Sequence, residues 1–419
     1  MKKKILALTL AGSLIAFGAA AALGAEKLSL TQCVAAALQN HPSLTAAEGT
    51  VESKKALVTQ AAVSSRMKAS ATGAYARTGS GSNNSGDWNS GLSLSQNLYD
   101  WGKSGSAIES ASLTKQAAEA TLLNTRNTVI ADVKDAYYGL NKATREIAVL
   151  KEQVKNYQQR LDWAKAYYAA GTKAKIEVTK AEADLANAQL ALIQSESSQE
   201  QYKAQLASAM GSPSLDIETV SDELDYQKWT IALDEALKQA AEKRPDLTAQ
   251  DLLVQKAKTD IKAASLTNAP DLTASAGYSF GGAGAFDDDQ WTAKLNLEFK
   301  FGDGGQTKAK IAQTKADLKV AQANRDKLAQ DIVLDVRKAW QSLRESAASI
   351  SAAQAAERQA KETLDLALGR YKAGVGDSLE ISDAVNGYAT AQTKVISCLY
   401  QHRAARLSLE KAMGEVSGS

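Results

Sequence analysis

Apolar residues recur at intervals of seven along two long stretches of the chain. The first stretch has Val133, Leu140, Ile147, Val154, Leu161 and Tyr168, and the second has Val336, Leu343, Ile350, Leu364 and Tyr371, with Glu357 as the exception. An apolar seam of this length is typical of helices that supercoil against partner helices rather than of a globular core. At about 1.5 Å per residue, some sixty such residues form a rod on the order of 90 Å long. We therefore predict long helical hairpins over about 105–211 and 308–414.

A period of two replaces the helical period in two other places. The later one alternates through Leu272, Ala274, Ala276, Tyr278 and Phe280, and then through Trp291, Ala293, Leu295, Leu297, Phe299 and Phe301. The earlier one is weaker, with Ala71, Gly73, Tyr75, Trp88, Leu92, Leu94 and Leu98. Strict alternation of apolar and polar residues predicts a β-strand with two unlike faces. We expect strand hairpins at about 68–98 and 271–301.

The chain contains an internal repeat. The segment from about Leu30 to Gly211 aligns without a gap with the segment 203 residues later in the chain. In this alignment Pro42 corresponds to Pro245, and Met210-Gly211 corresponds to Met413-Gly414. A repeat of this length means that one structural unit is used twice. The expected organisation is a first repeat over 26–211, a linker over 212–227 and a second repeat over 228–419.

The first residues have the pattern of an export signal. Lys2-Lys3-Lys4 precede an apolar run from Ile5 to Ala22 and small residues up to Ala25. This pattern favours a secretory signal peptide over 1–25 rather than a membrane-spanning helix. Its removal changes the formal net charge from +2 to −1, because three lysines and no acids are lost. A nearly neutral mature protein gives no reason to expect nucleic acid as a partner.

The residue types offer little for catalysis. His41 and His402 are the only histidines and have no partner at ligand spacing, and no phosphate loop or nucleophile elbow is present. Cys33 and Cys398 do not correspond under the repeat, which favours two separate buried thiols over one disulfide. The run Asp287–Asp289 reads better as a solvated turn than as a cation site. We expect a protein that is not an enzyme and has no cofactor or bound metal.

The strands are about ten residues long, which suits a tilted crossing of a bilayer, and aromatic residues lie toward their ends. A soluble sheet with one wet face would alternate in the same way. The flanking helices, however, are too long to pack over two short hairpins. The apolar face of the sheet would therefore be exposed in water. Four strands cannot close a barrel, eight close one filled by side chains, and twelve leave an aqueous lumen. We therefore predict an α+β membrane protein, a homotrimer with a twelve-stranded barrel continuous with a tube of twelve helical segments.

Several motifs resemble those of the TolC-type outer-membrane efflux proteins, over nearly the whole mature chain. They are Asn40-His41-Pro42, Lys243-Arg244-Pro245, Leu98-Tyr99-Asp100-Trp101-Gly102, Tyr168-Ala169-Ala170-Gly171 and Tyr371-Lys372-Ala373-Gly374. The resemblance implies a channel-tunnel of a tripartite efflux or type I secretion system. Such a duct would span the outer membrane, extend into the periplasm, and dock to a periplasmic adaptor and an inner-membrane pump. Drugs, metal ions and unfolded polypeptides all pass through channels of this type.

The resemblance also implies a gate at the periplasmic end. Glu380 and Asp383 stand at the spacing of the family's acidic gate positions, about one helical turn apart, although acids on a solvated helix face would look the same. Glu177 and Tyr371 match positions that tether neighbouring hairpins in the closed state, although Tyr371 also belongs to the apolar seam. Gly376 stands where the family has an arginine, which removes one expected salt-bridge tether.

The glycine turns of the two helical hairpins are the expected docking points for the adaptor. They contain Gly171 and Thr172 in the first repeat and Gly374 and Val375 in the second. The family's apolar residue after the first glycine is Thr172 here. The alternative from another class is a soluble periplasmic or surface coiled-coil scaffold with a small strand cap. A periplasmic adaptor is excluded, because adaptors carry a single helical hairpin between compact β domains.

Overall fold

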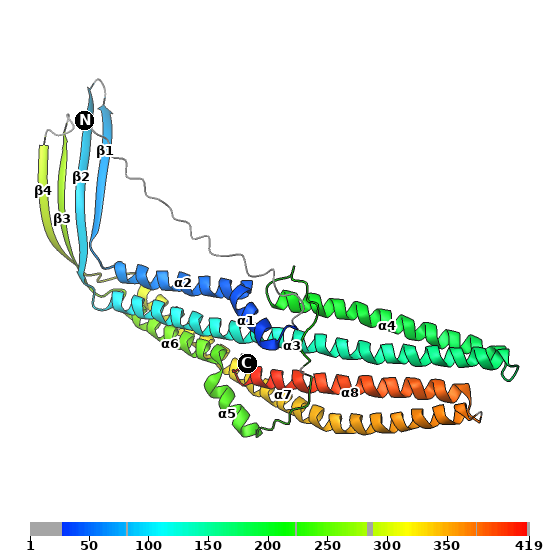
Figure 1. The fold of residues 1–419 in the computed structure, drawn as a ribbon. Helices are drawn as coiled ribbons and strands as arrows, with labels where there is room; N and C mark the ends of the chain where they lie inside the picture. Colours follow the sequence, from blue (N-terminus) through cyan, green and yellow to red (C-terminus); the bar gives the residue numbers. More distant parts are fainter. Residues whose placement is uncertain (1–26, 81–82, 223, 283–287, 374, 417–419) are drawn as a thin grey trace.

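A four-stranded sheet stands at one end of the molecule, and a bundle of long helices extends from it to the other end (Figure 1). The computed structural model describes residues 27–80, 83–222, 224–282, 288–373 and 375–416. The expected signal peptide, Asp287 and Gly374 lie outside these ranges.

The two repeats have the same order of elements. The first contains α1 (Leu30–Asn40), α2 (Pro42–Val63), β1 (Lys68–Ser80), β2 (Asn83–Tyr99), α3 (Lys103–Ala169) and α4 (Lys175–Ala209). The second contains α5 (Leu233–Lys243), α6 (Pro245–Ser265), β3 (Asp271–Gly282), β4 (Asp288–Glu298), α7 (Gln306–Lys372) and α8 (Ser378–Ala412). Pro42 and Pro245 each stand at the first position of a helix, where a missing N–H costs nothing.

The helices form two rows of four that share α3 and α7. Near the sheet the neighbours are α2, α3, α6 and α7, and farther away they are α4, α3, α8 and α7. Each of α3 and α7 has 67 residues, which corresponds to roughly 100 Å. The seven-residue seam is buried at most positions, among them Val133, Leu140, Val336 and Leu343, but Tyr168 is 48 % exposed. Within the described part of the chain, no helix has the length and apolar composition to cross a membrane.

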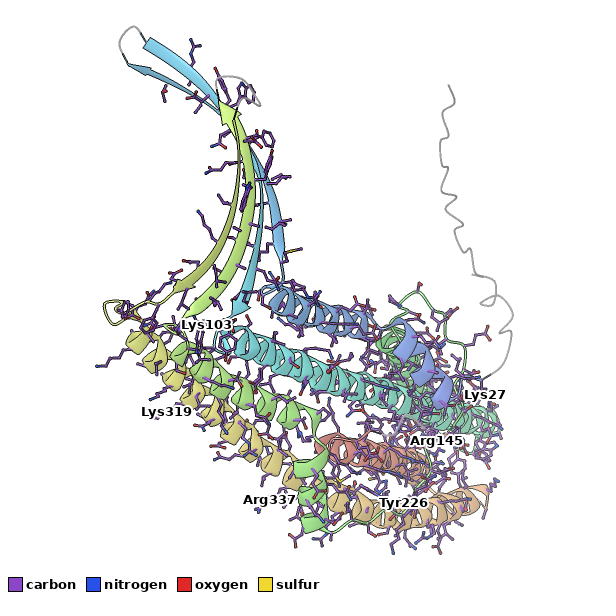
Figure 2. All side chains as sticks on the ribbon, turned by 90° about the vertical axis from the view of Figure 1, so that its left-hand side faces the viewer. Lys27, Lys103, Arg145, Tyr226, Lys319 and Arg337 are labelled. Carbon is purple, nitrogen blue, oxygen red and sulfur yellow. The ribbon has the colours of Figure 1, made fainter. Side chains whose placement is uncertain are left out.

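The sheet is antiparallel, with strand order β1-β2-β3-β4, and both of its edges are unpaired. Its strands have 13, 17, 12 and 11 residues, which is longer than the sequence pattern predicts. The register brings apolar residues of all four strands to one face, as in the row Ala71, Leu92, Tyr278 and Trp291. β4 ends at Glu298, so Phe299 and Phe301 follow the strand rather than extend it. Side chains project from both faces of this curved sheet (Figure 2).

Asp100 and Asp303, which correspond to each other under the repeat, have the same structural role at the junctions between the sheet and the long helices. Asp100 accepts hydrogen bonds from the N–H groups of Gly102 (3.1 Å) and Ser104 (2.9 Å), and Asp303 accepts them from Gly305 (3.0 Å) and Thr307 (2.7 Å). These bonds satisfy amide groups at the starts of α3 and α7 that have no partner within the helix. Hydrogen bonds from Thr307 and Asn268 hold the pKa of the Asp303 carboxyl below its ordinary value.

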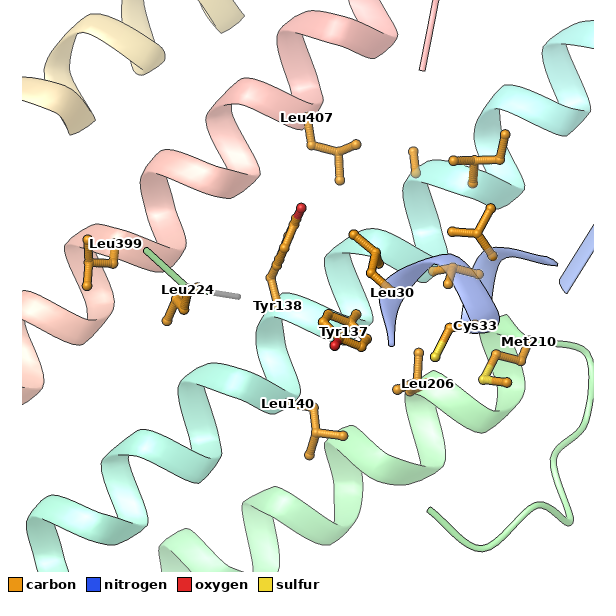
Figure 3. Packing of buried hydrophobic residues seen from close by; sticks show 14 of the residues in the cluster. Leu30, Cys33, Tyr137, Tyr138, Leu140, Leu206, Met210, Leu224, Leu399 and Leu407 are labelled. Atoms are coloured by element: carbon orange, nitrogen blue, oxygen red, sulfur yellow. The ribbon is translucent and has the colours of Figure 1, made fainter. Parts of the chain in front are cut away.

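The largest core cluster joins α1 to the long helices (Figure 3). Leu30, Cys33 and Val34 of α1 are buried in the same cluster as Leu140 of α3 and Leu206 of α4. The Tyr137 hydroxyl donates to the carbonyl oxygens of Leu28 (3.2 Å) and Ser221 (2.8 Å), which fastens the linker to α3. Cys33 and Cys398 are both free and buried, in agreement with the prediction of separate thiols.

The repeated Met-Gly pairs contact the repeated proline breaks. Gly211 has φ +71, and a Cβ there would lie 2.8 Å from the His41 Cα. Gly414 has φ +87, and its Cβ would lie 2.7 Å from the Arg244 Cα. Only glycine combines a left-handed backbone with such a close approach. The end of the return helix is thereby held against the break between the first two helices in each repeat.

We predict that Gly211→Ala destabilises the protein by about 1–3 kcal/mol, because the new methyl group overlaps backbone atoms and the left-handed conformation is strained. Gly49→Ala is the matched control, since Gly49 lies inside α2 with no atom within 4 Å of an added Cβ. That control should be neutral or stabilising by up to about 1 kcal/mol. The midpoint of thermal unfolding, followed by circular dichroism, measures both effects. Equal midpoints for the two variants would contradict the interpretation.

Candidate functional site

The end of the molecule far from the sheet consists of two helix reversals (Figure 1). In the first, Gly171 adopts φ +72, and the N–H and hydroxyl groups of Thr172 donate to the Tyr167 carbonyl at 3.0 and 2.9 Å. In the second, the N–H groups of Val375 and Gly376 both donate to the Arg370 carbonyl at 3.1 Å. Gly171, Thr172 and Val375 are exposed, and the Val375 side chain is 71 % accessible. Exposed apolar side chains also flank the turns, namely Tyr168 and Ile176 in the first hairpin and Leu379 in the second.

A buried arginine, Arg160, connects the two helical hairpins on the side of these turns that faces the sheet. Arg160 of α3 is 1 % exposed, forms an ion pair with Asp184 of α4, and donates from Nη2 to the Ser378 hydroxyl of α8 at 2.7 Å. The same Asp184 oxygen accepts the Ser382 hydroxyl of α8 at 2.8 Å, and the Tyr157 hydroxyl donates to the Ser382 carbonyl at 3.4 Å. We name Arg160, Asp184, Ser378 and Ser382 the hairpin latch. It holds two separate helical hairpins together through an ion pair in which the arginine is buried and the aspartate is partly buried.

The sequence analysis did not identify the hairpin latch. A signal was nevertheless available, because Arg160 and Asp184 lie 11 residues before and 13 residues after Gly171. In a helical hairpin, residues at similar distances from the reversal face each other across the two helices. Opposite charges paired across the predicted turn would have indicated this contact, but not its burial or its link to α8.

The predicted tether residues Glu177 and Tyr371 come close to each other without a hydrogen bond. Tyr371 is 2 % exposed, and neither its hydroxyl nor the Oε2 atom of Glu177 has a hydrogen-bond partner in the described structure. Burial raises the pKa of the Tyr371 hydroxyl, and the neighbouring Glu177 carboxylate raises it further. Tyr371 also packs edge-on against Tyr167, at 5.6 Å between ring centres. The tyrosine thus fills the seam, and its hydroxyl keeps its proton without donating a hydrogen bond to the Glu177 carboxylate.

The glycine at position 376 is a steric requirement of this turn. A Cβ there would lie 2.7 Å from the Tyr371 backbone nitrogen and 3.0 Å from the Arg370 carbonyl carbon. No larger side chain fits unless the turn opens. An arginine tether from this position is therefore incompatible with the observed turn, and the hairpin latch supplies a buried arginine contact from α3 instead.

The two predicted gate acids are both exposed on α8 but differ in their surroundings. Glu380 pairs with Arg370 of α7 at 3.2 Å, so its charge is partly balanced within its own hairpin. Asp383 lines a groove of about 690 Å³ between α3, α4 and α8, together with Asp184, Asn187, Asn386 and Glu146. The structure therefore leaves Asp383 as the less compensated of the two carboxylates.

The histidines and the aspartate run considered in the sequence analysis make contacts within the fold. His41 accepts the Ser43 N–H at Nδ1 (3.2 Å) and so caps α2, while His402 is buried against the Tyr226 ring. Asp289 accepts the Tyr278 hydroxyl at 2.7 Å. In the described ranges, no three His, Cys, Asp or Glu side chains are grouped as ligands of a metal ion.

Comparison with known proteins gives one consistent picture. Residues 33–212 and 236–415 each match the family described as Outer membrane efflux protein. Pyoverdine export outer membrane protein OpmQ of Pseudomonas aeruginosa is 23 % identical over 355 residues, covering 84 % of this chain and 75 % of that protein. Outer membrane protein TolC of Escherichia coli is 21 % identical over 352 residues, covering 80 % and 71 %.

The fold has close counterparts among solved structures. The CusC channel superimposes with a TM-score of 0.82 at 20 % identity, over 92 % of both chains. The outer-membrane channel OprN gives a TM-score of 0.81 at 20 % identity, over 92 % of this chain and 90 % of that one. The predicted fold class and the resemblance to TolC-type proteins are confirmed by these matches.

We predict that the hairpin latch is worth far more than an exposed ion pair. Arg160→Ala should destabilise the protein by about 1–3 kcal/mol, because it leaves the partly buried Asp184 carboxylate and the Ser378 hydroxyl without their partner. The double-mutant cycle of Arg160→Ala and Asp184→Ala should give a coupling of roughly 1–3 kcal/mol. Lys165 and Glu182 join the same two helices at 3.7 Å, but both are exposed, so their cycle should give less than about 0.5 kcal/mol. Similar couplings for the two pairs, measured by thermal unfolding, would refute the buried role.

Proposed function

The chain belongs to the outer membrane efflux protein family, and from this premise we propose that three copies form one continuous export duct. Each copy supplies four strands to a twelve-stranded barrel in the outer membrane and four helices to each level of a periplasmic tube. The observation that carries this proposal is the sheet, with one apolar face and two unpaired edges. Open edges have no hydrogen-bond partners in lipid, so β4 of one copy must pair with β1 of the next.

The helical bundle of one copy has two sides that no other helix of the same copy covers. α2 and α4 lie at one side of the four-helix rows and α7 lies at the other. Exposed large apolar residues occur on both sides, namely Leu57 and Val63 of α2, Leu190 and Ile193 of α4, and Val320, Val333 and Leu366 of α7. Exposed apolar surface on a coiled-coil helix marks a partner helix. In the closed ring, α7 of one copy covers α2 and α4 of its neighbour.

The duct works by passive passage. It is not an enzyme, since its task is to give solutes a water-filled route through the outer membrane while other proteins supply the energy. The relative OpmQ is named for pyoverdine export, which agrees with a role in export for this chain. An adaptor in the periplasm and a pump in the inner membrane complete the route. A soluble coiled-coil scaffold has no support from the family match, which covers both repeats.

Closure of the duct occurs at the periplasmic hairpins. Three copies of Glu380 and three of Asp383 form two acidic rings there, which favour the passage of cations. Because Arg370 partly balances Glu380, the Asp383 ring has the stronger field. The hairpin latch keeps the α7/α8 hairpin against the α3/α4 hairpin, and the ring of Tyr371 packed against Tyr167 of α3 forms a second, weaker contact. Opening requires the two hairpins to separate, which breaks both contacts.

The exposed turns dock to the adaptor. Gly171 and Thr172 on one hairpin and Val375 on the other face the periplasm at the tip of the tube, and Gly374, the remaining residue of the predicted docking turns, lies outside the described residues. Small side chains let a partner helix approach the backbone closely, and Val375 offers an apolar contact at the centre of the turn. The hydroxyl of Thr172 is occupied by its bond to Tyr167, so this turn keeps its shape when the partner is absent.

We predict that the purified protein needs detergent and has the mass of a trimer. The physical reason is that one sheet exposes its apolar face until three sheets close into a barrel. Multi-angle light scattering, corrected for bound detergent, measures the protein mass directly. Purified trimers should also conduct ions across a planar bilayer. A monomer that is monodisperse in buffer without detergent would disprove the duct.

We predict that Val375→Asp lowers export at least about tenfold without loss of the trimer, since a charge replaces the exposed apolar contact at the tip. Leu215→Asp is the matched control, because Leu215 is also an exposed apolar residue but lies in the linker. Export is measured by complementation of a strain that lacks this protein, and assembly by cross-linking. Full export by the Val375 variant would rule out docking at this turn.

A further inference from the structure

The inner face of the sheet carries two lysines that the proposed export function does not explain. Lys68 of β1 and Lys294 of β4 are both exposed. The register connects them in one row across the four strands, through Ser95 and Ser275. The adjacent row on the opposite face consists of Ala69, Leu94, Ala276 and Ala293. Since successive residues of a strand point to opposite faces, the lysines lie on the polar face that becomes the barrel interior.

The two rows of the polar face next to these lysines, toward the far ends of the strands, contain only small or uncharged residues, and Asp87 is on the same face two rows beyond them. The next two rows on the polar face contain Ser70, Ser93, Gly277 and Thr292, and then Thr72, Gly91, Ser279 and Gln290. In the opposite direction the first acids are Asp271 and Glu298, which pair with Lys103 at 2.7 Å and Lys300 at 3.8 Å. Within the described residues, no carboxylate forms an ion pair with Lys68 or Lys294.

We propose that Lys68 and Lys294 form a cationic band inside the barrel that favours small anionic solutes, such as those with carboxylate, sulfate or phosphate groups. This inference rests on the trimeric duct proposed above. Three copies place six ammonium groups around the wall. With strands about 4.8 Å apart and tilted by about 40°, the Lys68 and Lys294 rings lie roughly 9 Å apart along the axis. The band thus covers a short section of the lumen.

The dimensions allow this band to act on passing ions. Twelve strands with that spacing and tilt close into a barrel with a backbone radius of roughly 12 Å. Lysine side chains extend inward from this wall, whereas the neighbouring serines and glycines leave the lumen open. The Debye length is about 10 Å at 0.1 M salt, so the field of the band reaches across the lumen. At 1 M salt it falls to about 3 Å, and the field is confined to the wall.

A competing explanation is protection of the sheet edges. β1 and β4 are the edge strands, and lysines on edge strands discourage wrong pairing with other chains. That role does not require the lysines to face the lumen, and it predicts aggregation rather than altered ion selectivity when they are removed. The two explanations therefore give different results in one set of variants.

The test compares ion selectivity in planar bilayers across a KCl gradient centred on 0.1 M. The acidic rings favour cations and would mask an effect of the lysines, so all variants are made in a parent protein that carries Glu380→Gln and Asp383→Asn. These two substitutions should themselves reduce the preference for potassium relative to the wild type. Adding Lys68→Gln and Lys294→Gln to this parent should lower the chloride-to-potassium permeability ratio at least about twofold. The difference should vanish at 1 M KCl.

Two control variants of the same parent separate the possible outcomes. Lys68→Arg with Lys294→Arg keeps the charge and should keep the ratio, while Arg77→Gln removes a charge from the opposite face and should not change it. Conducting trimers whose ratio is unaffected by the glutamine substitutions would overturn the cationic band, as would aggregation with an unchanged ratio. Wild-type protein that forms neither trimers nor a conductance would overturn the duct itself, and the band with it.

Discussion

The unpaired hydrogen-bonding groups at the two edges of the sheet are the constraint on which the rest of this protein depends. In hydrocarbon each unsatisfied N–H or C=O group costs several kcal/mol, so a sheet of four strands cannot stay alone there. Only neighbouring copies can supply the missing partners. Once three sheets form a ring, the helices attached to them must form a ring of the same symmetry, which is why α2, α4 and α7 expose apolar residues at their outer sides.

The tandem repeat gives each copy two halves with the same order of elements. The contacts that occur at corresponding positions in both halves are the ones that connect the helices and strands within each half. Gly211 against His41 and Gly414 against Arg244 close the same joint twice, and Asp100 and Asp303 begin the two longest helices in the same way. The halves differ at the far end. Tyr168 is exposed where Tyr371 is buried, and Arg160 has Thr363 as its counterpart. The two hairpins of one copy are therefore not equivalent at this end.

Charge is distributed unevenly along the duct. Glu380 and Asp383 are exposed near the helix reversals, the buried Arg160 pairs with Asp184 between the hairpins, and Lys68 and Lys294, which have no ion pair among the described residues, are on the polar face of the sheet. Buried and exposed charges have different effects, because the buried Arg160 with its partner Asp184 acts on the geometry of the hairpins, while exposed side chains act on passing ions. In the proposed duct a solute would meet the acids of the helical tip first, the lysines where the strands begin next, and Asp87 near the far ends of the strands last.

The sequence by itself determined the periods of seven and two, the repeat and the reversal points, because these follow from which residues are apolar and from where glycine and proline stand. These patterns were enough to predict the four strands, the long hairpins and the class of fold. The hairpin latch, the steric need for Gly376 and the pairing of Glu380 with Arg370 were decided only by the tertiary structure. The physical reason is that each depends on how close two helices approach, and spacing along one chain does not specify that distance.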